Sequence, residues 1–72
     1  MSNVQAVSAY KMEQFIFLNR LRESGETNMF GASPYVQCAF STTKREAQKI
    51  VAEWMAWVTA NPSNRDLDYD DL

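Results

Sequence analysis

The chain has 72 residues, of which 46% are hydrophobic and only two are glycine and two proline. This composition excludes an intrinsically disordered chain and fits one small domain. The single cysteine excludes a disulfide-stapled scaffold and indicates a reducing compartment, so the sequence predicts a cytoplasmic protein. The formal net charge of −2 argues mildly against nucleic acid as a partner.

The first predicted helix is Ala9–Glu23, a stretch without glycine or proline that ends before Ser24-Gly25. Its apolar side chains spread over a wide arc, and Met12 and Ile16 point away from the others. Residues 15–18 are also compatible with a short buried strand, but the sequence continues without a turn and offers no partner strand. A helix that is apolar on more than one side is either wrapped by other elements or paired with another chain.

The second predicted helix is short, Pro34–Phe40. Ser33 is its expected N-cap, which leaves the proline in the first helical position, where a missing N–H costs nothing. Cys38 is expected as a small buried residue of this helix. The helix offers three side chains to the core: Val36, Ala39 and Phe40. Residues 27–33 are expected to form a connection that packs across the helices.

The third predicted helix is Lys44–Thr59, and its start is marked by a capping-box signature of Thr43 and Glu46. Its apolar residues fall within one arc of about 160°. They are Ala47, Ile50, Val51, Trp54, Met55, Trp57 and Val58. Trp54 lies at the centre of this arc and is expected in the core. Asn61-Pro62 ends the helix, because the residue before proline is pushed out of the helical region.

The last twelve residues, 61–72, carry one arginine against four aspartates, a net charge of −3. They are predicted to form a mobile tail that keeps the protein soluble or docks on a basic surface of a host protein. Residues 1–8 are expected to be flexible. The sequence therefore predicts an all-α fold: a compact three-helix domain over residues 9–60 with a helix-turn-helix-like second half and a mobile acidic C-terminal tail.

The sequence lacks the residues on which catalysis commonly depends. It contains no histidine, and its one cysteine provides neither a thiolate metal site nor a Cys–His pair. Gly25 and Gly31 are isolated and do not form a phosphate-binding loop. We therefore expect no enzymatic activity, no metal site and no cofactor.

One run of residues, Thr27–Ala32 (TNMFGA), is the most distinctive part of a longer pattern. The pattern comprises Leu21–Tyr35 (LRESGETNMFGASPY), followed by Phe40, Glu46-Ala47 and Trp54-Met55. Over residues 13–58 the chain resembles a group of small bacteriophage proteins without an assigned activity. The resemblance carries over no functional residue. It implies an accessory factor in the bacterial host cytoplasm that binds a host or phage macromolecule, or else a minor component of the virion.

The leading functional prediction is binding to another protein, either a host or phage protein or a second copy of this chain. The first helix carries more apolar surface than a small domain easily hides, and a homodimer would cover it. The predicted contact residues are Met12, Ile16, Phe17 and Trp57, the last at the edge of the apolar arc of the third helix. No stretch approaches the roughly 18 apolar residues that span a bilayer, so a membrane is not expected as a partner.

The alternative prediction is a small DNA-binding or transcription-modulating protein. The short second helix, a turn at residues 41–43 and the longer third helix have the outline of a helix-turn-helix unit. Its second helix would present a polar strip to phosphates and base edges. The strip consists of Lys44, Arg45, Gln48 and Lys49. Against this alternative, the turn lacks the usual glycine and the protein is acidic.

Overall fold

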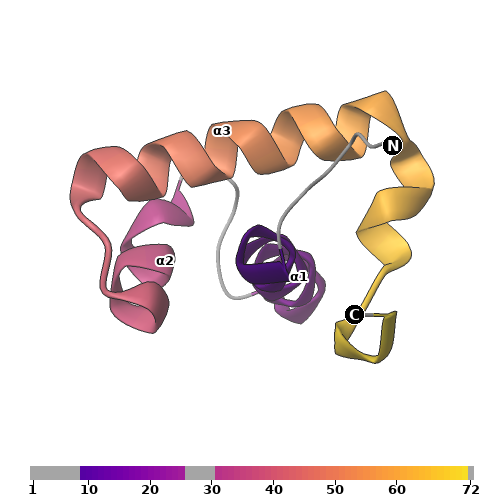
Figure 1. The fold of residues 1–72 in the computed structure, drawn as a ribbon, viewed down its shortest axis with the longest axis horizontal. Coiled ribbons are helices and arrows are strands. Elements are labelled where there is room, and N and C mark those ends of the chain that lie inside the picture. Colours follow the sequence, from indigo (N-terminus) through magenta and orange to yellow (C-terminus); the bar gives the residue numbers. More distant parts are fainter. Residues whose placement is uncertain (1–8, 26–30, 72) are drawn as a thin grey trace.

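The fold is known from a computed structural model, which describes residues 9–25 and 31–71. The chain runs through α1 (Ala9–Ser24), α2 (Ser33–Phe40) and α3 (Lys44–Ala60). Two 3₁₀ turns follow, η2 (Pro62–Asp66) and η3 (Tyr69–Asp71), and Figure 1 shows how they hang from the end of α3. The described part of the chain is helical without a strand, so the all-α, three-helix prediction is confirmed. The predicted flexible N-terminus (1–8) and most of the predicted connection at 27–33 lie outside the described residues.

Helix α3 begins where the sequence predicts. The N–H of Glu46 donates to Thr43 Oγ1 at 3.1 Å, and the N–H of Thr43 donates to Glu46 Oε1 at 3.0 Å, which completes the capping box. The helix continues to Ala60, one residue beyond the predicted end. It stops because Asn61, which precedes a proline, has an extended backbone with φ −149° and ψ 98°.

Helix α1 lies in the middle of the molecule. In Figure 1 it is seen nearly end-on beneath α3, with α2 on one side and the C-terminal turns on the other. This position explains the wide apolar arc of its sequence. Phe15, Ile16 and Leu18 are each at most 4% exposed although they do not share one face, because neighbours surround the helix. Of the two arrangements expected for such a helix, the structure shows the wrapped one.

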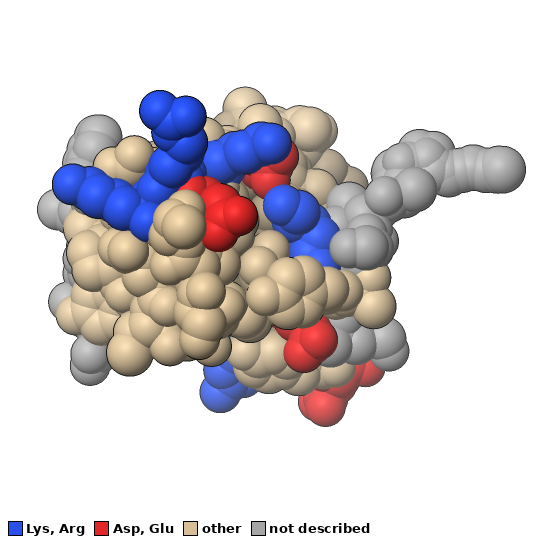
Figure 2. Space-filling model, turned by 60° about the vertical axis from the view of Figure 1, so that its left-hand side comes forward, with Lys and Arg blue, Asp and Glu red and all other residues tan. Residues whose placement is uncertain are grey.

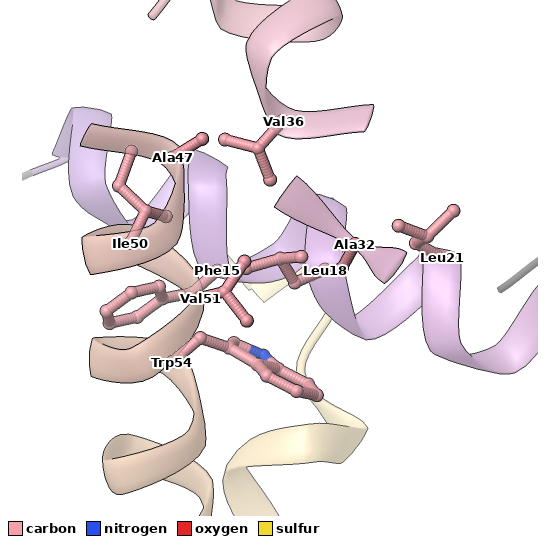
Figure 3. Packing of buried hydrophobic residues seen from close by; sticks show 9 residues of the cluster. All are labelled: Phe15, Leu18, Leu21, Ala32, Val36, Ala47, Ile50, Val51 and Trp54. Atoms are coloured by element: carbon pink, nitrogen blue, oxygen red, sulfur yellow. The ribbon is translucent and has the colours of Figure 1, made fainter. Parts of the chain in front are cut away.

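The core lies where the three helices meet, as Figure 3 shows. Helix α1 contributes Phe15, Leu18 and Leu21; α2 and the residues before it contribute Val36 and Ala32; α3 contributes Ala47, Ile50, Val51 and Trp54. Each of these side chains is less than 9% exposed, and the central position expected for Trp54 is confirmed at 3%. Five half-buried side chains pack around this cluster: Phe17, Phe40, Met55, Trp57 and Val58.

Helix α2 differs from its prediction in two respects. It begins at Ser33 with Ala32 as the N-cap, so the expected Ser33 cap is wrong. The fully buried Ala32 already has helical geometry, and its carbonyl accepts hydrogen bonds from the N–H groups of Tyr35 (3.0 Å) and Val36 (3.2 Å). Cys38 is exposed rather than buried, because it lies about 200° around the helix from the core residue Val36. Ala39, also expected in the core, is exposed.

The C-terminal segment (residues 61–71) contacts α1, which the prediction of a mobile tail did not anticipate. The Asn19 amide, 3% exposed, donates from Nδ2 to the carbonyls of Asn64 and Leu67, each at 3.0 Å. Its Oδ1 accepts a hydrogen bond from Trp54 Nε1 at 2.9 Å. One buried side chain therefore joins α1, α3 and the C-terminal segment. The composition of the segment suggested mobility. The hydrogen bonds that hold the segment use its backbone carbonyls, which the residue types do not reveal.

An exposed ion pair joins the same two parts of the chain further out. Arg20 Nη1 lies 2.8 Å from both carboxylate oxygens of Asp68, and its guanidinium stands 5.6 Å from the ring centre of Tyr69. The N–H of Tyr69, which donates to Asp68 Oδ1, and the Arg20 guanidinium together lower the pKa of Asp68 below its ordinary value of 3.8. Because the side chains of Arg20 and Asp68 are 59% and 47% exposed, we regard this pair as a positioning contact rather than a large source of stability.

We predict that Asn19→Ala lowers the free energy of unfolding by about 3 kcal/mol, since it leaves buried donors and acceptors unpaired. In a domain of this size, whose whole stability is about 3–5 kcal/mol, this loss unfolds much of the population. Urea unfolding followed by circular dichroism measures the change. Gln48→Ala, on the exposed side of α3, is the control and should change the stability by less than about 0.5 kcal/mol. A loss below about 1 kcal/mol for Asn19→Ala would contradict the proposed role of this amide.

The contact between Arg20 and Asp68 should depend on pH. A lowered folded-state pKa means that the stabilising contribution is present above the unfolded pKa and is lost as the pH falls through the folded pKa. We therefore expect the contact at neutral pH and its release in strong acid, below about pH 3.8. In an NMR titration of the Asp68 carboxyl group, Arg20→Gln should raise the midpoint part of the way, because the Tyr69 N–H still donates. Arg22→Gln, the control, should leave the midpoint unchanged, and an equal shift in both variants would refute the assignment.

Candidate nucleic-acid interface

The four residues predicted to contact a protein partner do not all lie at the surface. Ile16 is fully buried, so it is excluded from such a surface in this fold. Phe17 is half-buried and packs edge-to-face on Phe40, with ring centres 5.4 Å apart. Trp57 is half-buried and packs against Phe15, with ring centres 4.9 Å apart. Met12 is also half-buried. The apolar surplus of α1, on which the homodimer prediction rested, is largely used inside the domain.

The α2–turn–α3 unit has helix-turn-helix proportions. Eight residues of α2 are followed by a three-residue turn, 41–43, and then by α3. Ser41 ends α2 in the left-handed conformation, with φ 55° and ψ 42°. This is the conformation for which glycine is favoured in such turns. The missing glycine therefore does not prevent the turn, because a serine adopts the geometry in its place.

The face of α3 that points away from the core is uncovered. In Figure 1, α2, α1 and the C-terminal turns all lie on the same side of α3. On the opposite side lies the outer face of α3, a row of exposed residues: Arg45, Gln48, Lys49, Ala52 and Ala56. The polar residues lie in its N-terminal half, beside Lys44, which is also exposed. The alanines keep the second half flat, so another surface can come close to the helix.

The cations of this region are available to a partner. Within the described residues, Lys44, Arg45 and Lys49 take part in no ion pair, whereas Lys11 lies 2.7 Å from Glu53 and Arg20 pairs with Asp68. Figure 2 shows several basic side chains gathered on the upper part of one face, with acidic side chains between them. Two of the three cations stand in the first turn of α3, where the positive end of the helix dipole disfavours them. An anionic partner would relieve this repulsion.

Glu46 is exposed in the first turn of α3 beside the cations, whereas the aspartates of the protein lie elsewhere. Three of the aspartates in the C-terminal segment, Asp68, Asp70 and Asp71, lie in or next to η3, whereas the outer face has its cations at the opposite end of α3. Figure 1 shows these two ends on opposite sides of the molecule. The net charge of −2 therefore does not describe the surface around the start of α3.

The structure brings Lys44, Arg45, Gln48 and Lys49 together as predicted, and it adds features that sequence reasoning missed. Ala52 and Ala56 extend the same face, and their position opposite the apolar arc could have been found from the helical period. The left-handed Ser41 left no signal in the sequence. Among the described residues, no three His, Cys, Asp or Glu side chains lie close enough to hold a metal ion. None of the helices in residues 9–25 and 31–71 is long and apolar enough to cross a membrane.

Comparisons with protein-family models, with curated proteins and with solved structures gave no match to this chain.

We predict that Ser41→Gly stabilises the protein by up to about 1 kcal/mol, because it removes the left-handed penalty of a residue with a Cβ. The matched control is Ser33→Gly, the same change at a helical position, which should destabilise it by about 0.5–1 kcal/mol. Thermal unfolding of both variants measures the difference. Destabilisation by Ser41→Gly as large as that by Ser33→Gly would mean that residue 41 is not left-handed in solution.

Proposed function

We propose that this protein binds duplex nucleic acid through α3, without catalysing a reaction. The observation that carries the proposal is the uncovered outer face of α3 in a unit of helix-turn-helix proportions, with three cations that pair with no described carboxylate. In such units the second helix enters the major groove and its N-terminal residues contact bases and phosphates. Arg45, Gln48 and Lys49 are exposed in the N-terminal half of α3, where such contacts would be made.

The dimensions and residue types of α3 suit this role. A helix of about 10–12 Å diameter fits the major groove, which is about 12 Å wide. Arg45 and Lys49 can contact guanine edges or phosphates, and Gln48 can pair with adenine. Ala52 and Ala56 allow the helix to approach closely and offer methyl groups to thymine. Three phosphate contacts give a modest affinity that falls with salt concentration with a logarithmic slope of about −2.7.

The setting proposed for this activity is the cytoplasm of a phage-infected bacterium. The resemblance of residues 13–58 to small bacteriophage proteins supports it. In that setting a small protein that binds nucleic acid can modulate transcription or occupancy of a site by other proteins.

Binding to a host or phage protein is the second candidate function. It is favoured by three large exposed aromatic side chains, Tyr10, Tyr35 and Tyr69, of 39–55% exposure. Tyrosine is enriched in protein interfaces. These tyrosines lie on three different elements, α1, α2 and η3, so they support this function less strongly than the outer face supports the first.

The first candidate is tested by fluorescence anisotropy of a labelled duplex over a range of salt concentrations. We expect the double variant Lys44→Glu/Arg45→Glu to bind at least about tenfold more weakly and to reduce the salt slope by about 2. The matched control is Arg22→Glu/Arg65→Glu, which changes the net charge equally through exposed residues away from the start of α3. Its affinity should change far less.

Two results would contradict the nucleic-acid proposal. One is equal weakening by the two double variants, which would show that only the net charge matters. The other is the absence of duplex binding by the natural sequence even at low salt, which would leave a protein partner as the favoured function.

A further inference from the structure

We infer that a groove beside the start of α3 holds a phosphate group, and that it receives a backbone phosphate of the nucleic acid bound by the outer face. This inference rests on the proposed function and names a contact within it. The groove lies between the first turns of α1 and the turn that joins α2 to α3. Its volume is about 380 Å³. The residues used in the argument are Tyr10, Gln14, Phe40, Thr42, Glu46 and Lys49.

Two polar side chains of the groove have no partner. Thr42 Oγ1 is buried, and no hydrogen bond satisfies it within the described structure. Gln14 is only 2% exposed, and among residues 9–25 and 31–71 no hydrogen bond reaches its side-chain amide. Among the described residues, Thr42 Oγ1 is the one fully buried side-chain atom without a partner, and such atoms are rare and costly. The Gln14 amide lines the same groove without a hydrogen bond in the described structure, so together they indicate a binding partner. Because Thr42 Oγ1 is shielded from solvent, a ligand in the groove would reach the hydroxyl only after a rotation about χ1.

The groups that converge on the groove are hydrogen-bond donors. Gln14 offers an amide NH₂, Thr42 a hydroxyl and Lys49 an ammonium group. One tetrahedral oxyanion can accept from all three, and these are residue types that contact nucleic-acid phosphates. The only carboxylate among the lining residues, that of Glu46, is held in the capping box by the N–H of Thr43; it keeps its negative charge and partly offsets that of Lys49. Lys11, also at the groove, is paired with Glu53, so it contributes little net charge.

The position of the groove connects it to the outer face of α3. Lys49 belongs to both, because it stands at the margin of the outer face and also lines the groove. A helix in the major groove is flanked by the phosphates of the backbone, and contacts to them fix its register. Tyr10 and Phe40, packed edge-to-face with centres 6.0 Å apart, form the apolar wall on which a sugar can rest. A phosphate held by Gln14 and Thr42 would thus set the depth of α3 in the groove of the duplex.

The test follows the Gln14 side-chain NH₂ and the Thr42 backbone N–H by NMR, first with inorganic phosphate and then with a duplex. Sodium chloride at equal ionic strength is the reference for the first arm. We expect saturable shifts of both signals with phosphate and with duplex. Thr42→Val and Gln14→Met should each weaken duplex binding about three- to tenfold for all sequences alike, because the lost contact reads no base. Neither change removes a charge, so the salt slope should stay constant.

Matched control variants separate a loss of duplex binding at the groove from a general effect of the substitution on the fold. Thr59→Val and Gln37→Met make the same changes outside the groove and should leave binding unchanged. Thr42→Val should also raise the midpoint of thermal unfolding without ligand, since it removes an unpaired buried hydroxyl.

The titrations with inorganic phosphate and with duplex distinguish the possible sources of the phosphate group. Shifts with both probes support a backbone phosphate, and shifts with inorganic phosphate alone support the site with a small phosphorylated molecule as its ligand. If the duplex binds through Lys44 and Arg45 while the groove signals stay unmoved by either probe, the groove inference is wrong and the proposed function stands. If neither probe moves the signals and no duplex binds, both are wrong.

Discussion

The side chain of Asn19 lies where α1, α3 and the C-terminal segment meet. It is almost completely buried, yet its donors and its acceptor are used by carbonyls of the C-terminal segment and by the Trp54 indole. A buried amide with every partner in place tolerates no other arrangement of its neighbours, because any shift leaves a polar group unpaired. The register of α3 over α1 and the position of the C-terminal turns therefore depend on this residue.

The central position of α1 determines which surfaces the molecule can offer. Because α2, α3 and the C-terminal segment all pack against α1, its apolar residues are used in the core. Helix α3, in contrast, has its neighbours on one side only within residues 9–25 and 31–71. The exposed face of α3 is therefore the surface through which an extended partner can approach without disturbing the core, and its charge differs from that of the opposite end of the molecule.

The features of the fold that depend on residues close together in the sequence could be predicted. Thr43 and Glu46 act within one turn, and the buried face of α3 repeats with the helical period, so both were predicted correctly. The exposure of Lys44, Arg45 and Lys49 follows from the same period. Burial of Ile16 could not be predicted in this way, because it depends on how many elements surround α1. Cys38 was placed wrongly because an eight-residue helix with one buried residue gives too weak a pattern.

The contacts that hold the C-terminal segment against α1 join residues far apart in the sequence. Composition gives no indication of such contacts. Asn19 looks like an ordinary polar residue of a helix until Asn64 and Leu67 are known to lie beside it. Ser41 likewise gives no sign of its left-handed backbone. In both cases the residue type permits the observed role without demanding it, and only the packing of the complete domain selects it.

The sequence distances of the Asn19 hydrogen bonds bear on the order in which the protein acquires its structure during synthesis. The partners of this amide lie 35, 45 and 48 residues further along the chain. Contacts within the α2–turn–α3 unit are much shorter in range and pay less loop-closure entropy, so they can form first. Helix α1 leaves the ribosome early but lacks its last buried partners until residue 67 has been made. Until α3 has been made, the apolar sides of α1 are open to chaperones or to a second nascent chain.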